Sequence, residues 1–134
     1  MRVAVCIDDF GGMIFNGRRQ SRDRALTADL LREVGEGKLR IFPFSAELFE
    51  ANTVTVSADF LSEAGEDELC FLENEPLSPH LDRVGELILY RWNRRYPRDL
   101  LLDVDPLAAG LRLAEQTELR GYSHETITKE RYTR

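Results

Sequence analysis

The sequence predicts a single α/β domain with a central mixed β-sheet and flanking helices. Three observations carry this prediction. In the first half of the chain, short apolar runs of strand type alternate with helical patterns, as in parallel strands joined by crossovers. Near the C-terminus, strand-like segments follow one another directly, which favours an antiparallel edge. The 134 residues contain no internal repeat, low-complexity stretch or linker, so we expect one domain over residues 1–134.

The first half of the chain contains a buried strand, a long helix and two shorter strands. Val3 to Ile7 is a continuous apolar run rich in β-branched residues, as expected of a strand buried on both faces. Asp23 to Gly35 has leucines at helical spacing and ends in glycine. Lys38 to Phe44 and Thr53 to Val56 fit short strands. Residues 45–51 fit a short helical turn, and residues 58–64 fit either a short helix or a loop.

The second half of the chain is richer in strands. Glu68 to Leu72 and Glu86 to Trp92 are apolar strand-like runs, and residues 76–84 between them fit a short helix. Leu111 to Leu119 and Thr126 to Tyr132 fit a closing hairpin. The expected sheet therefore has parallel crossovers first and an antiparallel edge last.

The composition limits the classes of partner. A net charge of −6 argues against non-specific binding to nucleic acid or to an anionic membrane. No apolar run approaches the roughly 18 residues that a membrane helix needs. Cys6 and Cys70 both lie in apolar runs, and the N-terminus shows no signal-peptide pattern. Free buried thiols and a cytoplasmic location are therefore expected.

The charges are unevenly distributed along the chain. Residues 59–75 carry seven acids and no base, whereas residues 17–24 and 91–98 each carry four arginines. The basic segments fit either solvated faces or two patches that meet around an anionic ligand. The acidic segment suggests an alternative function, that of an acidic immunity-type inhibitor covering a basic toxin or nuclease.

Two carboxylates and two glycines follow the first strand directly. Asp8 and Asp9 stand where ligand sites of open α/β sheets are commonly found, at the carboxyl end of a strand, and Gly11 and Gly12 come next. One carboxylate could act as a general base. The alternative is a turn in which both residues satisfy backbone amides.

The arginine cluster is the second candidate feature. Arg18, Arg19 and Arg22 suit phosphate or carboxylate recognition, because guanidinium groups pair bidentately with such anions. The alternative is a solvent-exposed loop paired with the acidic segment 59–75. Asp23 stands at a helix start, where its default role is that of an N-cap.

Residues 92–96 (Trp-Asn-Arg-Arg-Tyr) mix aromatic and basic side chains. Trp92 and Arg94 could stack on a nucleobase and bind its phosphate. Trp92 is equally well explained as part of the core.

His124 is the remaining candidate for proton transfer. A relay through Ser123, His124 and Glu125 is incompatible with an extended strand, since adjacent side chains point to opposite faces. His124 would instead share a site with Asp8 or Asp9, or make a structural hydrogen bond.

Taken together, these residues favour binding of an anionic small molecule, such as a nucleotide or another phosphorylated ligand. The site would be formed by the loop from Asp8 to Asp23 with Arg94 and His124, and any catalysis would be acid–base. The residues predict no metal site, assign no cofactor and leave open whether the protein is an enzyme.

The order of elements resembles the dihydrofolate reductase fold. VAVCIDDFGGMIFNG, the helix from Asp23 and KLRIFPF match its first strand, glycine-containing loop, helix and second strand. ELCFLENEPLSPHLDRVGELILYRW and the closing hairpin are similar to its later part. The resemblance implies a second alternative function, an NADPH-dependent reductase with a pterin-like substrate.

Two segments depart from that family. Residues 18–20 (Arg-Arg-Gln) stand where the family has Leu-Pro-Trp, and residues 73–76 (Glu-Asn-Glu-Pro) replace the diglycine that approaches the cofactor pyrophosphate. The family's buried acid in the first helix maps to Asp23 or Asp29, and the spacing does not choose between them.

A second resemblance is to a group of short bacterial proteins, some labelled ribonuclease Z. FNGRRQSRD, YRWNRRYPRD and GYSHETITKERY carry this similarity. The label implies a clustered histidine motif that holds two metal ions. With only His80 and His124, far apart in the sequence, the chain cannot supply that site.

Overall fold

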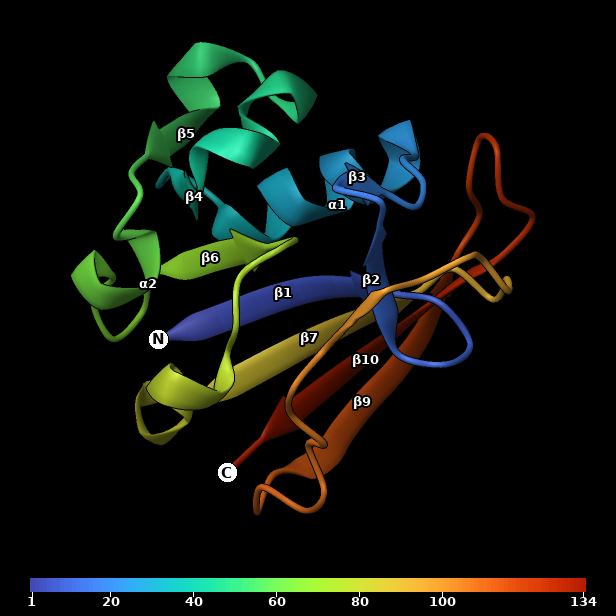
Figure 1. Ribbon diagram of the computed structural model, residues 1–134. Helices are drawn as coiled ribbons and strands as arrows, with labels where there is room; N and C mark the ends of the chain where they lie inside the picture. The colour runs from blue at the N-terminus through green and yellow to red at the C-terminus, as the bar shows by residue number, and fades with distance from the viewer.

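A seven-stranded mixed sheet forms the centre of the computed structural model, which describes residues 1–134 (Figure 1). In the order of the sheet, its strands are β5 (Val54–Val56), β4 (Leu39–Ile41), β6 (Leu69–Leu72), β1 (Arg2–Ile7), β7 (Glu86–Arg91), β10 (Ile127–Thr133) and β9 (Arg112–Leu119). The first five strands are parallel, and β10 and β9 are antiparallel to their neighbours. The expected α/β class, with its central mixed sheet and antiparallel edge, is confirmed.

Strand β1 lies in the middle of the sheet because both of its faces are apolar. It pairs in parallel with β6 and β7, so that Val3 lies opposite Cys70 on one side and Leu87 on the other. Val3 and Val5 face one core and Ala4 faces the other, and all three are fully buried. A continuous apolar run is what a strand buried on both faces requires.

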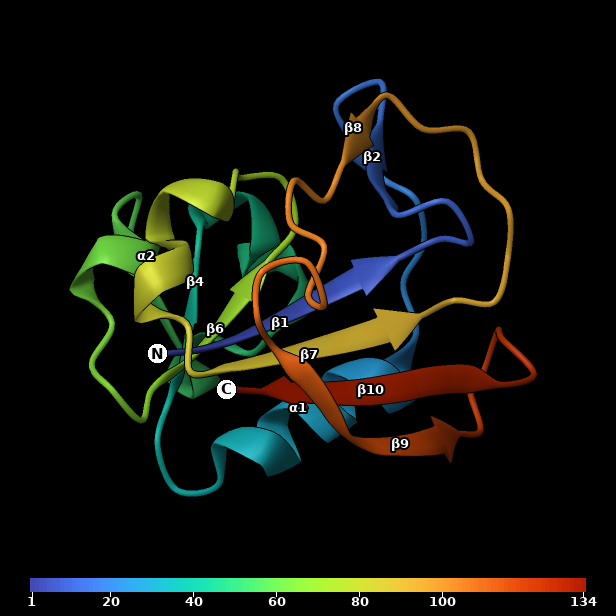
Figure 2. The same ribbon diagram turned by 90° about the horizontal axis from the view of Figure 1, so that it is seen from below.

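Two layers cover the sheet. Helix α1 (Arg24–Val34) packs Leu26 and Leu30 against one face, as Figure 2 shows below the sheet. The short helix α2 (Phe60–Glu63) and the 3-10 helix η3 (Ser78–Arg83) lie on the opposite side. The 3-10 helices η1 (Pro43–Leu48) and η2 (Ala51–Thr53) connect β4 to β5. Each face of the sheet therefore has its own apolar core.

The boundaries of α1 follow from its caps. The side chain of Asp23 accepts a hydrogen bond from the N–H of Ala25, and Gly35 ends the helix with a φ of 70°. Asp23 is a standard N-cap, and the positive φ of Gly35 is a left-handed conformation that glycine adopts without strain. The predicted strand over Lys38–Phe44 is shorter than expected, because Pro43 opens η1.

The segment from Asp8 to Asp23, which was expected to be a loop, contains a β-hairpin instead. Strands β2 (Gly12–Phe15) and β3 (Arg18–Arg19) pair with each other, and β8 (Leu100–Leu101) completes a small antiparallel sheet. Asn16 and Gly17 form the turn, with φ values of 52° and 74°. Two consecutive positive φ angles mark a type I′ turn, for which Asn-Gly is the preferred sequence. The loop expectation was therefore wrong for these residues.

Both cysteines are free thiols, as the apolar surroundings predicted. Burial raises the pKa of Cys70 to about 12 and raises that of Cys6 well above its usual value. Neither thiol is therefore activated as a nucleophile. No helix in the structure has the length and apolar character to cross a bilayer.

Candidate functional site

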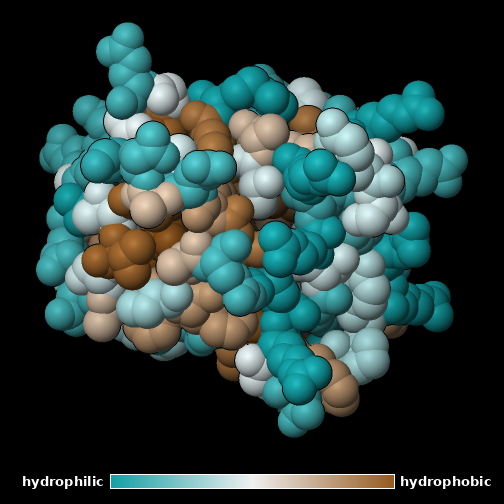
Figure 3. All heavy atoms as spheres, turned by 90° about the horizontal axis from the view of Figure 1, so that it is seen from above, coloured by the Kyte–Doolittle hydropathy of each residue, from teal (hydrophilic) through white to brown (hydrophobic).

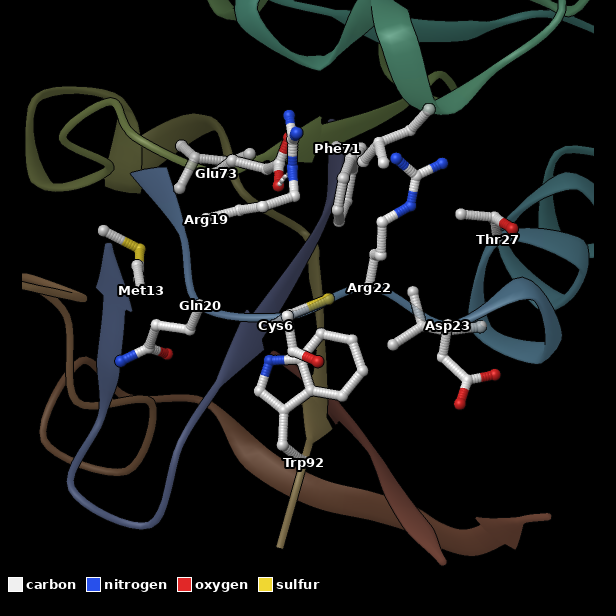
Figure 4. Close-up of a pocket in the computed structure, with 14 residues that line it drawn as sticks. Cys6, Met13, Arg19, Gln20, Arg22, Asp23, Thr27, Phe71, Glu73 and Trp92 are labelled. Carbon is white, nitrogen blue, oxygen red and sulfur yellow. Dashed lines mark hydrogen bonds and ion pairs between the residues drawn. The ribbon is translucent and has the colours of Figure 1, made fainter. Parts of the chain in front are cut away.

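A pocket opens at the carboxyl ends of β1, β6 and β7, beside the first turn of α1 (Figure 4). Its empty volume is about 390 Å³, including the open space at its mouth. Half of the lining side chains are apolar, and the others are concentrated in the segment that joins β3 to α1. This edge of an α/β sheet is where ligand sites are usually found. The lining residues are Cys6, Met13, Arg19, Gln20, Ser21, Arg22, Asp23, Leu26, Thr27, Leu48, Phe71, Leu72, Glu73 and Trp92.

Asp23 ties the β9–β10 connection to the start of α1. Beyond capping α1, its carboxylate accepts hydrogen bonds from the N–H groups of Tyr122 at 3.0 Å, Ser123 at 2.9 Å and His124 at 3.2 Å. Burial alone would raise the pKa of Asp23, but these hydrogen bonds and that of the His124 ring hold it well below its usual range. Asp23 is therefore an ionised, buried anchor as well as a cap.

His124 is the partner that the carboxylate holds in place. Its Nδ1 lies 3.0 Å from Oδ2 of Asp23, and its Nε2 lies 3.1 Å from the Ser21 hydroxyl and 3.0 Å from the Tyr96 hydroxyl. The ring stacks on Trp92, with centroids 4.5 Å apart and planes 27° apart. Since an ionised carboxylate can only accept, Nδ1 carries the proton and Nε2 is left with its lone pair towards the two hydroxyls.

The backbone of the β9–β10 connection approaches Asp23 closely at Gly121. A Cβ at this position would lie 2.4 Å from the carbonyl oxygen of His124 and 2.6 Å from Oδ2 of Asp23. Only glycine allows this approach, so the sequence around Gly121 is fitted to the Asp23–His124 contact.

Arg19 is fully occupied by acidic side chains. Its guanidinium donates to both oxygens of Glu73, at 2.9 and 3.0 Å, and also contacts Glu47 and the carbonyl oxygen of Phe44. Ser45 donates a further hydrogen bond of 2.7 Å to Glu73. Arg19 lines the pocket, but its charge is already neutralised within the chain.

Arg22, by contrast, makes no ion pair and no side-chain hydrogen bond. It is exposed and lines the pocket, and Figure 4 shows its side chain extending towards Phe71 and Thr27. An unpaired guanidinium at the mouth of a half-apolar pocket is available to a bound anion.

Gln20 contributes an acceptor that has no partner. Its Nε2 donates to Oδ2 of Asp8 at 3.1 Å and to the carbonyl oxygen of Pro97 at 3.2 Å, which fixes the orientation of the amide. The amide oxygen Oε1 is buried and accepts no hydrogen bond. A donor on a ligand or a water would satisfy it.

The structure does not bring Asp8 or Asp9 to His124. Asp8 is fully buried and accepts hydrogen bonds of 2.8 Å from the N–H groups of Phe10 and Gly12, which makes it the anchor of the turn after β1. Asp9 is exposed and its side chain has no partner. The acid that contacts His124 is Asp23, which the sequence had suggested mainly as a cap.

The arginines of the two basic segments do not converge on one cavity. Arg18 is exposed and lines a separate shallow groove with Tyr96 and Pro97, whereas Arg94 is exposed and unpaired. Arg98 lies over the ring of Phe10. The two segments do meet through uncharged groups, at the Gln20–Pro97 hydrogen bond and at the hydroxyls around His124.

The site residues that sequence reasoning missed are Ser21, Gln20 and Tyr96. Each is an ordinary polar side chain, and only the fold brings them to His124 or the pocket. The one sequence signal for this segment is the run of four consecutive polar residues at 20–23 (Gln-Ser-Arg-Asp), just before a helix.

Part of the negative charge of residues 59–75 is paired with arginines of the same chain. Glu63 and Glu68 contact Arg40, and Glu73 pairs with Arg19. The face in Figure 3 carries an apolar area on the side of β4 and β5 and is otherwise mainly hydrophilic. Neither observation supports a basic protein as the partner.

No family model matches the sequence, and no curated protein matches it. Among solved structures, the chain is similar to a dihydrofolate reductase from Enterococcus faecalis in complex with NADP(H) and RAB-propyl. The TM-score is 0.71 at 9% sequence identity, and the match covers 99% of this chain and 95% of that chain. The chain therefore has a dihydrofolate reductase-like fold.

Proposed function

We propose that the protein binds a small anionic molecule in this pocket and that His124, oriented by Asp23, serves as its acid–base group. The observation that carries the proposal is the buried chain from the Asp23 carboxylate through the His124 ring to the Ser21 hydroxyl, which ends at the pocket. A carboxylate that stays ionised fixes the tautomer of the imidazole, so Nε2 can accept a proton from Ser21, the member of this chain of contacts that lines the pocket beside Asp23.

The ligand chemistry follows from the lining. Arg22 offers an unpaired guanidinium, whereas the other lining arginine is neutralised by Glu73. Phe71 and Trp92 supply apolar, aromatic surface on the walls. These groups together suit a compact ligand with an anionic group and an apolar body.

The replacement of Arg22 by glutamine tests the anion contact. We expect Arg22→Gln to weaken binding of the anionic ligand roughly 10- to 150-fold, because a hydrogen bond to a charged group contributes about 1.5–3 kcal/mol. The measurement is a thermal-shift panel of nucleotides, sugar phosphates, small carboxylates and NADPH, followed by calorimetric titration of whatever raises the melting temperature.

Arg112→Gln is the matched control, since Arg112 is exposed on β9 and makes no ion pair. A panel that leaves the melting temperature unmoved would refute the proposal, as would a ligand bound equally well by Arg22→Gln. If NADPH is the one compound of the panel that raises the melting temperature, the result would favour the reductase alternative.

A further inference from the structure

We propose that Ser21 is a nucleophile and that the pocket hydrolyses a small carboxylic ester bearing an anionic group. This inference rests on the proposed function, because it takes the same pocket as the substrate site. It adds a covalent step and a substrate class to the acid–base role of His124.

The three side chains have the relation of a nucleophile, a base and an orienting acid. The Ser21 hydroxyl is 3.1 Å from Nε2 of His124, and Nδ1 of the same ring is 3.0 Å from Asp23. Both distances lie within the hydrogen-bond range expected of such a relay. Ser21 and Asp23 precede α1 whereas His124 comes from the β9–β10 connection, so the relay is assembled from separated segments.

The surroundings keep the base in its working orientation. The Trp92 ring stacks on the imidazole, and the backbone N–H groups of Ser123 and His124 hold the carboxylate that orients it. Asp23 also lines the pocket, but its carboxylate is engaged by the His124 ring and by backbone N–H groups, so its role is that of a positioning residue. Preorganisation of this kind lets a serine hydroxyl lose its proton as it attacks.

Groups that could receive the developing negative charge lie beside the nucleophile. The backbone N–H groups of Ser21, Arg22 and Asp23 donate to no protein acceptor. Donors without partners next to a reacting carbonyl are the components of an oxyanion hole. The Arg22 side chain then holds the anionic group of the substrate, at the other end from the ester.

The reaction balances with water as the only co-reactant. Oγ of Ser21 attacks the ester carbonyl carbon while its proton passes to Nε2 of His124. The tetrahedral intermediate collapses, the C–O bond to the alcohol breaks, and His124 returns the proton to the departing oxygen. Water then attacks the acyl-serine with His124 again as base, which releases the carboxylic acid and restores Ser21.

Tyr96 competes with Ser21 for the same nitrogen. Its hydroxyl lies 3.0 Å from Nε2, and one lone pair cannot accept well from both hydroxyls. Tyr96→Phe removes this competitor and retains the ring. If Ser21 is the nucleophile, we expect the Tyr96→Phe protein to react at Ser21 at least as fast as the unaltered protein.

The test is covalent labelling of the full chain with a fluorophosphonate, in which an Oγ–P bond forms and fluoride leaves. We expect a single adduct on the peptide containing Ser21, located by mass spectrometry, and no adduct in Ser21→Ala. His124→Gln is expected to slow labelling at least 100-fold. Ser62→Ala, which alters an exposed serine on α2 with no hydrogen bond, should label normally.

Hydrolysis of the mono-4-nitrophenyl ester of succinic acid supplies the second readout, with the neutral butyrate ester beside it. We expect Arg22→Gln to lower the ratio of kcat/KM for the succinate ester to kcat/KM for the butyrate ester at least 10-fold. A folded protein that labels on another residue, or does not label at all, overturns the inference. If anions still raise the melting temperature in that case, the proposed function stands without it.

Discussion

Asp23→Ala is expected to lower the free energy of unfolding by roughly 3–5 kcal/mol, a large share of the stability of a domain of this size. The substitution removes the N-cap of α1, which is typically worth about 1 kcal/mol. It also strips the acceptor from three backbone N–H groups and from the His124 ring. Each buried donor left without a partner costs about 1–3 kcal/mol.

Urea unfolding followed by circular dichroism gives this number. Asp23→Asn is the informative companion, because the amide oxygen can still cap α1 and accept from the β9–β10 connection. We expect it to lose less stability than Asp23→Ala. A loss below about 1 kcal/mol for the alanine variant would contradict the role of Asp23 as the anchor of this connection.

Asp29→Ala is expected to cost a similar amount, about 3–5 kcal/mol, for a different reason. On the sheet side of α1, Asp29 accepts a hydrogen bond of 2.6 Å from the Tyr90 hydroxyl and pairs with Lys129 at 2.7 Å. Tyr90 is fully buried and Lys129 is nearly so. Removal of Asp29 leaves the Tyr90 hydroxyl buried without its acceptor and leaves Lys129 with only its longer contact to Glu33, at 3.5 Å.

The matched control is Asp82→Ala, since Asp82 is exposed on η3 and makes no side-chain contact. We expect the control to change stability by less than about 0.5 kcal/mol. Equal stabilities for the two variants would show that the Asp29 pair contributes nothing to the packing of α1 on the sheet.

The same residue also contributes to the acid sensitivity of the fold. Burial would raise the pKa of Asp29, but the Lys129 and Tyr90 contacts lower it below its ordinary value of 3.8. As the pH falls, Asp29 is therefore protonated in the unfolded chain before it is protonated in the folded protein. The free energy that the ionised Asp29 contributes to folding is present above about pH 4 and is lost as the pH falls further. Stability measured between pH 7 and pH 3 should decline less steeply in Asp29→Ala.

Much of the fold could be predicted because local pattern and final environment agree. The apolar run of β1 becomes a strand buried on both faces, and the leucine spacing of α1 becomes the face that packs on the sheet. The β2–β3 hairpin was also encoded, by Asn16 and Gly17, but its strands are too short to show a convincing period.

The site could be predicted only in part, because its contacts join residues about a hundred positions apart. Asp23 and His124 were both recognised as candidates, yet no pattern in the sequence pairs them. The same limitation applies to Arg19. Its charge suggested anion binding, but in the structure its guanidinium pairs with Glu73. Arg22 is also an arginine but has no partner, and this difference between the two arginines arises only from tertiary structure.

The tautomer of His124 decides whether Nε2 can act as the base of this pocket. The chain has only two histidines, so nitrogen NMR of ¹⁵N-histidine-labelled protein at pH 8, with His80→Gln for assignment, resolves each ring nitrogen. We expect Nδ1 of His124 to carry a proton, towards Asp23, and Nε2 to be unprotonated and to face Ser21. A proton on Nε2 would contradict this expectation, because the ring could then accept no proton from the pocket.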